Sequence, residues 1–296
     1  MASSKRGKPE IVFVTGKGGV GKSVVAAALA LRAARSGRKT LLVEFGRQSF
    51  YERLLDLPPG TGEYPGQPGL ELARWEDEAC LREYVGHYLP VARAADLFLG
   101  NRVIRALIRA APTLKELALI GKATGPHRLR WTRTDHELMV IDAFSTGHFL
   151  ALLRAPRGIN EAVPVGPVGR QTRTILEVLR DPTKCRFVVV TLAEELPVTE
   201  ALELHEAIVS ETGQHARLIC NKIQPPVDDS ELERVRRAES GPAAAFASRL
   251  AMVRDRQRHW IDVLCGTDDE VLLWPYHYAG RADAVIAALA GEAGTV

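Results

Sequence analysis

Short runs of consecutive apolar residues, separated by helical patterns, constrain the fold of this chain most strongly. Five runs stand out, at 11–15, 40–45, 137–142, 185–192 and 216–222. Two weaker runs lie at 271–275 and 70–74. Most are apolar throughout, which is typical of strands covered on both faces of a parallel sheet. The alternation with helices predicts βαβ units and an α/β fold with a mostly parallel sheet flanked by helices.

Helical patterns fill the intervals between these runs. They lie at 22–36, 146–154, 168–180, 197–212, 228–240 and 241–265. The interval 76–130 departs from the alternation. Three consecutive helices are predicted there, at 76–89, 91–110 and 113–122. We therefore expect a core formed by 1–75 and 131–296, with a helical insertion at 76–130.

The composition is that of an ordinary soluble protein, with 46% hydrophobic and 25% charged residues. The longest apolar runs, 24–31 and 187–190, are much shorter than the roughly 20 residues that cross a bilayer, so no transmembrane helix is predicted. The start of the chain lacks the apolar stretch of a secretory signal. Four dispersed cysteines without a CxxC pair favour a reducing compartment, and we expect a cytoplasmic protein. The net charge of +3 predicts no nucleic-acid partner.

A glycine-rich octet, GKGGVGKS, directly follows the first apolar run. It fits the phosphate-binding pattern G-x-x-x-x-G-K-[ST] between a strand and a helix, although a turn without a ligand is the alternative. Its glycines let backbone N–H groups surround a phosphate chain at a helix start. Lys22 is expected to reach the β- and γ-phosphates of ATP, and Ser23 to bind Mg²⁺. The predicted phosphate-binding residues are Gly16, Lys17, Gly18, Gly19, Val20, Gly21, Lys22 and Ser23.

Lys17, directly after the first glycine, is unusual for a general phosphate-binding loop (P-loop). It resembles the signature lysine of the deviant Walker A ATPases, the class of MinD/ParA, the nitrogenase iron protein and ArsA/Get. The resemblance implies that Lys17 reaches the nucleotide of a partner subunit and supplies charge to the transition state, as an arginine finger does elsewhere. A solvated loop lysine is the alternative.

The segment 137–154 supplies a second candidate for metal binding. Its hydrophobic strand leads to Asp142, an acid that can hold Mg²⁺ as a Walker B residue does. The following residues resemble switch II of the ArsA/Get family, D-T-A-P-T-G-H. The matching residues are Asp142, Thr146, Gly147 and His148, while Ser145 replaces the family's proline. The alternative is a buried strand followed by a capping turn.

Two later stretches resemble the same family. Residues 187–204 resemble V-T-x-P-E-x-L-P-x-x-E-T, in register at Glu195, Pro197 and Glu200. The sequence ICNKI resembles the strand end whose asparagine recognises adenine. This implies an ATP-binding role for Asn221 and Lys222, and an ordinary turn residue is the alternative for Asn221. The resemblance as a whole runs from about 10 to 275 and implies an ATPase of the ArsA/Get type.

Switch I departs from the family pattern D-P-A-H-S, whose aspartate positions or activates the attacking water. Gly46 stands at the aspartate position, and the nearest carboxylate is Glu44, two residues earlier. Glu44 can point to the same face of the strand, roughly 6–7 Å further back. It is either a catalytic residue that orients water or a buried acid paired with Arg47 or a P-loop lysine. Gly46, Arg47 and Gly147 are predicted moving parts.

The family resemblance also implies a nucleotide-switched homodimer, or a heterodimer with a related ATPase. Targeting members clamp zinc between subunits with a CxxC pair, which this chain lacks, so nucleotide and side chains must hold any dimer. In those members the insertion binds a hydrophobic client. Residues 97–120 here carry an apolar stripe bordered by arginines, which packs on the core or forms a client or dimer surface. The cysteines match no metalloid motif, so arsenite binding is not expected.

The sequence thus predicts a cytoplasmic ATPase that uses ATP and Mg²⁺ and handles a client, such as a hydrophobic protein segment or a membrane-associated partner. One rival is an ATP-gated assembly or scaffold factor with little hydrolysis, which the switch I departure favours. The other is a MinD/ParA-like positioning ATPase on membrane or DNA. Residues 288–296 show neither the amphipathic helix nor the basic face that this second rival needs.

Overall fold

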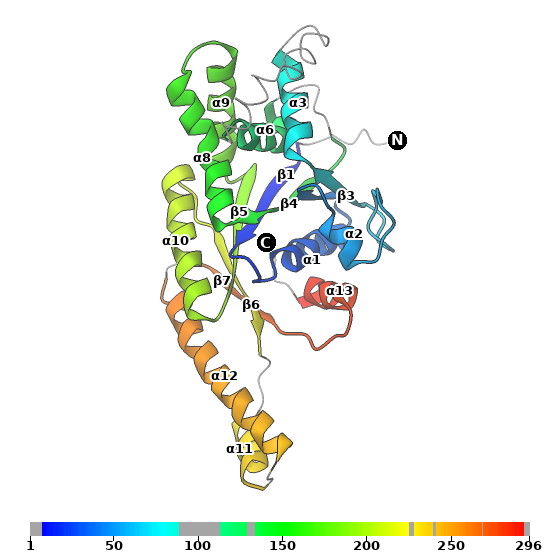
Figure 1. The fold of residues 1–296 in the computed structure, drawn as a ribbon, viewed down its shortest axis with the longest axis vertical. Coiled ribbons are helices and arrows are strands. Elements are labelled where there is room, and N and C mark those ends of the chain that lie inside the picture. The colour runs from blue at the N-terminus through cyan, green and yellow to red at the C-terminus, as the bar shows by residue number, and fades with distance from the viewer. Residues whose placement is uncertain are drawn as a thin grey trace.

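A sheet of seven parallel strands lies at the centre of the molecule, with helices on both faces (Figure 1). The structure is a computed structural model that describes residues 8–88, 113–128, 134–224, 228–238, 241–267 and 269–292. The strands are β1 (Glu10–Gly16), β2 (Thr40–Phe45), β3 (Leu70–Trp75), β4 (Leu138–Ser145), β5 (Cys185–Leu192), β6 (Arg217–Ile223) and β7 (Val271–Pro275). Each of the seven predicted runs is therefore a strand, and the predicted α/β fold is confirmed.

The described helices connect these strands and cover the sheet. They are α1 (Lys22–Arg35), α2 (Phe50–Leu54), α3 (Asp77–Tyr88), α6 (Thr113–Ala123), α7 (Gly125–Arg128), α8 (Thr146–Ala162), α9 (Gly166–Leu179), α10 (Glu195–Thr212), α11 (Asp229–Ala238), α12 (Pro242–Cys265) and α13 (Ala282–Glu292). Helices α2, α7 and α13 were not predicted from the sequence. Helix α8 also extends eight residues beyond its predicted end at 154, through Pro156.

The strand order is β3-β2-β4-β1-β5-β6-β7, which places β1 in the middle of the sheet. Successive side chains of a strand point to opposite faces. Ile11 and Phe13 belong to a buried cluster with α6, α8, α9 and α10, whereas Val12 and Val14 pack with α1 and α13. Because both faces are covered by helices, the central strands are apolar at nearly every position.

The described helices of the predicted insertion pack against this core. Cys80 and Leu81 of α3 lie in the buried cluster that also contains Phe149 of α8. Within α6, Leu117, Leu119 and Ile120 are buried in the same cluster, and Leu114 packs against it. This end of the apolar stripe therefore covers the sheet. The rest of the predicted stripe and its arginines, at 97–109, lies outside the described residues.

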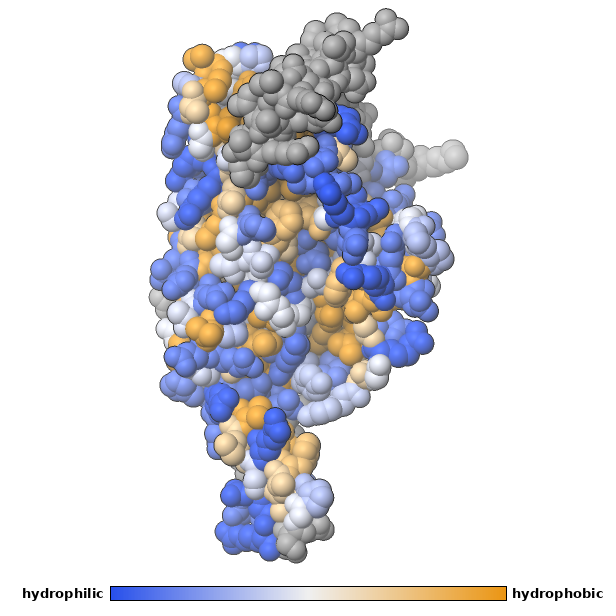
Figure 2. Space-filling model, in the orientation of Figure 1, coloured by the Kyte–Doolittle hydropathy of each residue, from blue (hydrophilic) through white to orange (hydrophobic). Residues whose placement is uncertain are grey.

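Helices α11 and α12 form a hairpin that projects away from the sheet (Figure 1). Phe246 and Met252 of α12 are exposed there, and Figure 2 shows apolar residues along this hairpin. None of the helices in the described part of the chain has the length and apolar character needed to cross a bilayer.

Candidate functional site

The carboxyl ends of β1, β4 and β6 bring the predicted site residues to one edge of the sheet. Ligands of open α/β sheets bind in the crevice at this edge. The octet 16–23 follows β1, and Asp142 pairs in register with Val14 of β1. Glu44 of β2 lies directly opposite Asp142 on the other side of β4. Asn221 reaches the octet from β6, because its side-chain amide donates to the Val20 carbonyl oxygen at 2.9 Å.

Two glycines of the octet stand where no other residue fits. Gly16 has φ 139°, and a Cβ there would lie 2.1 Å from the carbonyl oxygen of Val190 on β5. Gly21 has φ 96° and caps α1, and a Cβ would lie 2.5 Å from Nδ2 of Asn221. Side chains other than glycine are strained at these φ values and would also collide with those neighbours. The loop backbone is therefore held close to β5 and β6.

Two ammonium groups contact carbonyl oxygens of the octet. Nζ of Lys22 donates to the Lys17 carbonyl at 3.0 Å, and Nζ of Lys222 donates to the Gly19 carbonyl at 3.3 Å. Burial lowers the pKa of Lys22, because the charged form loses solvation, and Asp142 opposes that shift. These cations and the start of α1 make the loop a favourable place for an anion.

Lys17 forms an ion pair with Glu200 of α10 within the same chain. Both side chains are partly exposed. Glu200 is one of the residues in register with the family segment at 187–204. The structure thus connects the octet to α10 through the lysine that the resemblance directs toward a partner subunit.

The Asp142 carboxylate lies in a pocket of oxygen atoms beside the octet. It accepts hydrogen bonds from the hydroxyls of Ser23 and Tyr51, and the Tyr51 hydroxyl lies 3.1 Å from its Oδ2 and 3.0 Å from the Ser23 carbonyl oxygen. Burial raises the pKa of Asp142 to about 6, although the hydroxyls and Lys22 favour the charged form. Oxygen donors of this kind fit Mg²⁺, so Ser23 and Asp142 are suitable residues to hold it.

Tyr51 is a site residue that sequence reasoning missed. It is fully buried, and burial raises its pKa well above the usual range, with Asp142 acting in the same direction. It belongs to α2, which follows β2, and its hydroxyl reaches the Ser23 carbonyl oxygen of α1. A single tyrosine after a strand gives no sequence signal for such a contact.

Glu44 binds a backbone N–H group in this structure. Its Oε2 accepts from the Phe50 N–H at 2.7 Å, so the carboxylate stabilises the start of α2. The sequence offered Arg47 or a P-loop lysine as the partner of Glu44. Arg47 pairs instead with Glu76 at 3.1 Å and with Glu78 at 2.9 Å. Gly46, at the switch I position, has φ 135° and no atom within 4 Å of a Cβ placed there.

The predicted switch II follows β4 and begins α8. The Oγ1 of Thr146 is buried without a hydrogen-bond partner among the described residues, which is uncommon for a hydroxyl. The ring of His148 lies edge-on to Phe144, whose carbonyl oxygen accepts from the Thr15 hydroxyl at 2.9 Å. A Cβ placed on Gly147 would meet no atom within 4 Å. Thr15 therefore connects switch II to the strand that leads into the octet.

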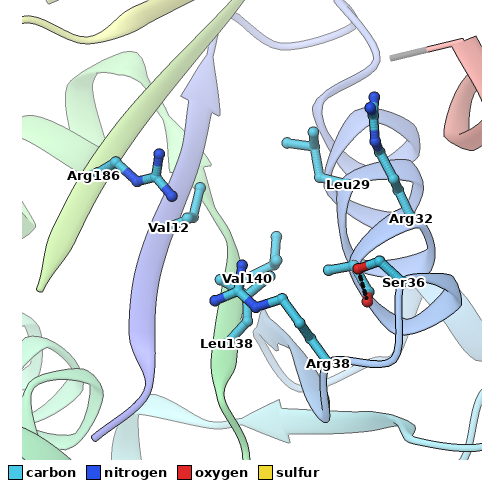
Figure 3. A pocket seen from close by; sticks show the side chains of 9 residues that line it. Val12, Leu29, Arg32, Ser36, Arg38, Leu138, Val140 and Arg186 are labelled. Carbon is cyan, nitrogen blue, oxygen red and sulfur yellow. Dashed lines mark hydrogen bonds between the residues drawn. The ribbon is translucent and has the colours of Figure 1, made fainter. Parts of the chain in front are cut away.

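A cavity of about 240 Å³ lies between the C-terminal half of α1 and the face of the sheet at β1 and β4 (Figure 3). Val12 and Val140 are among its apolar lining residues, and Arg38 and Arg186 border it. Both arginines pair with Glu10. Its lining includes no residue of the octet, so this cavity is separate from the predicted phosphate site.

Comparison with known proteins relates the chain to one family. Residues 9–45 match the family model of the anion-transporting ATPases. The ATPase BagA of Mycobacterium tuberculosis is 31% identical over 223 residues, which cover 72% of this chain and 65% of that protein. Arsenical pump-driving ATPases of Acidiphilium multivorum and Escherichia coli are each 26% identical, over 74% and 75% of this chain. The chain spans 40% of the length of each arsenical pump protein.

Proposed function

We propose that the chain, which is similar to ATPases of the ArsA type, binds and hydrolyses ATP with Mg²⁺. The observation that carries the proposal is the arrangement around residues 16–23. Two lysines contact carbonyl oxygens of the loop, and the Asp142–Ser23 pair lies beside it. An anion and a cation therefore have adjacent places at the same edge of the sheet, as Mg-ATP requires.

Each group has a distinct part in this proposal. The loop N–H groups and Lys22 bind the phosphates, for which Lys22 exchanges its contact with the Lys17 carbonyl for a phosphate oxygen. Ser23 and ionised Asp142 hold Mg²⁺, which neutralises phosphate charge when bound. Tyr51 keeps the Asp142 carboxylate oriented through its hydroxyl. Thr146, whose hydroxyl is buried without a partner among the described residues, lies at the start of switch II and is suited to respond to the bound nucleotide.

We extend the proposal to a nucleotide-switched homodimer. In it, Lys17 leaves Glu200 and contacts the nucleotide bound to the second copy. The partial exposure of both side chains supports this exchange, since such a pair is worth only about 0–1 kcal/mol. ATP would favour the closed dimer and hydrolysis would open it. The helices of 76–130, of which α3 and α6 rest on the core, would transmit that change to a hydrophobic client.

A second candidate is an ATP-gated assembly factor with little hydrolysis. The contact between Glu44 and the Phe50 N–H favours it, because this carboxylate is occupied by the start of α2 and Gly46 provides none. In this case the chain would bind Mg-ATP and change its association state without rapid turnover.

Steady-state release of phosphate from Mg-ATP separates the two candidates. We expect turnover that is lost in Lys22→Ala and retained in Lys39→Ala, a control in the connection between α1 and β2. Tight binding of ATP with no turnover above the Lys22→Ala background would favour the assembly factor. Solution mass with and without ATP tests the dimer, and a chain that stays monomeric in saturating nucleotide contradicts the role given to Lys17.

A further inference from the structure

Three side chains that the nucleotide site does not use meet beside the amino ends of β6 and β7. His205 comes from α10, His215 from the segment that joins α10 to β6, and Asp269 from the residues before β7. Parallel strands begin at the same edge of a sheet, so the topology brings these positions together although the first and last are 64 positions apart in the sequence. This edge is opposite the octet, which follows the carboxyl end of β1.

The three groups face one another closely. Nε2 of His205 lies 3.0 Å from Oδ2 of Asp269, and Nδ1 of His215 lies 2.6 Å from Oδ1. One ligand atom from each residue lies within 4.8 Å of the other two, and the imidazole centroids are 5.4 Å apart. A single carboxylate thus holds two imidazole rings around one point.

The burial of the cluster differs from that of an ordinary surface ion pair. The side chains of His205 and Asp269 are 7% and 13% exposed, whereas His215 is 69% exposed. Nδ1 of His205 is also buried, and no described group hydrogen-bonds to it.

The donor set selects a class of ligand. Imidazole nitrogen with one carboxylate oxygen suits Zn²⁺ and related divalent transition metals, whereas Mg²⁺ and Ca²⁺ prefer all-oxygen sites. Three protein ligands leave at least one position open to water or a small anion. His215 and Asp269 also line a cavity of about 240 Å³, together with Arg186 and Arg217. Glu270, the ion-pair partner of Arg217, lines it as well, so the open position can face a cavity of mixed charge.

We propose that His205, His215 and Asp269 form a binding site for one divalent transition-metal ion of the zinc type, separate from the nucleotide site. The ion would replace the two imidazole–carboxylate contacts, with neutral imidazoles and an ionised carboxylate as ligands. It would connect α10 to the starts of β6 and β7.

Zinc titration of the full chain tests this site and requires neither bound nucleotide nor a measurement of ATP hydrolysis. Chelator-treated protein competes with a chromogenic chelator for Zn²⁺, and we expect one equivalent to bind. His215→Ala changes a mostly exposed side chain and should retain the fold, as checked by circular dichroism. His215→Ala and Asp269→Asn, each as a single variant, should weaken Zn²⁺ binding at least about 100-fold. His259→Ala, an exposed histidine of α12, and Cys265→Ser, an exposed thiol, should bind as the unchanged chain does.

Cobalt substitution identifies the ligands. Co²⁺ should give visible bands of a nitrogen- and oxygen-ligated site, without thiolate charge-transfer absorption. The proposal is overturned if the unchanged chain and His215→Ala bind Zn²⁺ with the same affinity, or if neither binds it. The cluster is then only a hydrogen-bonded bridge. Loss of binding in Cys265→Ser would also overturn it, since the metal would then depend on a thiol.

Discussion

The two edges of the sheet hold their charges in different ways. At the carboxyl edge, Lys22 and Lys222 contact backbone carbonyls and Glu44 contacts a backbone N–H. At the amino edge, acidic side chains meet basic ones: Glu10 pairs with Arg38 and Arg186, and Glu270 pairs with Arg217 at 2.6 Å. The Lys17–Glu200 pair and the pairs of Arg47 with Glu76 and Glu78 are exceptions at the carboxyl edge.

This difference separates binding from stability. A cation on a neutral carbonyl, or a carboxylate on a hydroxyl, can exchange that contact for an ionic ligand at small cost. A pair of opposite charges already satisfies both members, so its main effect is on the folded chain. We therefore expect substitutions at the carboxyl edge to change nucleotide binding, and those in the arginine–glutamate pairs of the amino edge to change stability without changing nucleotide binding.

The largest expected effect is that of Gly16→Ala. The added Cβ would collide with the Val190 carbonyl, and φ 139° strains any side chain, so the free energy of unfolding should fall by at least about 3 kcal/mol. Urea denaturation measures this. The control is Gly158→Ala, an exposed position within α8 with open space around it, where a gain of up to about 1 kcal/mol is expected. Equal effects at the two positions would show that the octet is not held against β5.

Asp142→Asn should stabilise the nucleotide-free chain while abolishing Mg-dependent ATP binding. An acid with a folded pKa of about 6 binds protons preferentially in the native state, so stability falls as pH rises from about 4 to about 6. The variant lacks this loss and should be more stable by about 1–3 kcal/mol at pH 7. Thermal denaturation across this pH range measures it. A variant less stable than the unchanged chain at pH 7 would mean that the charged carboxylate stabilises the fold.

Glu10→Gln provides the converse case at the amino edge. It leaves Arg38 and Arg186 without their shared carboxylate, and should lower the free energy of unfolding by about 1–2 kcal/mol. ATP affinity should be unchanged, as measured by calorimetry. A weaker ATP affinity in this folded variant would contradict the separation of the two edges.

Glu200→Gln should have the smallest effect on stability, less than about 1 kcal/mol, because the pair with Lys17 is partly exposed. Its effect on association should be larger, since Lys17 is released for a second copy. Measured by solution mass, Glu200→Gln should form a dimer at a lower ATP concentration than the unchanged chain does. Lys17→Ala should form no dimer. If Glu200→Gln needs a higher ATP concentration than the unchanged chain to form a dimer, the Lys17–Glu200 pair supports the dimer and does not compete with it.

Features formed by neighbouring residues could be predicted from the sequence, whereas contacts between distant segments could not. The strands and the octet are contiguous patterns whose meaning depends on neighbouring residues, so their positions could be predicted. Helix α13 could not, because its burial depends on packing against α1, which lies about 250 residues earlier. Tyr51 and the Lys17–Glu200 pair likewise depend on how the connections return to the sheet.

The amino edge gave no sequence signal, because its residues are dispersed. His205, His215 and Asp269 have neither the spacing of a metal motif nor a shared element, and only the pairing of β6 with β7 brings them together. Arg186 and Glu10 meet for the same reason across β1 and β5.

Calorimetric titration of Mg-ATP into the unchanged chain and into Lys22→Ala tests the central claim most directly. We expect saturable binding by the unchanged chain and at least about 100-fold weaker binding by the variant, since the loop loses its principal contact to the phosphates. The difference should disappear when adenosine replaces ATP. No heat of binding with the folded, unchanged chain, or equal affinity in Lys22→Ala, would contradict a nucleotide site at residues 16–23.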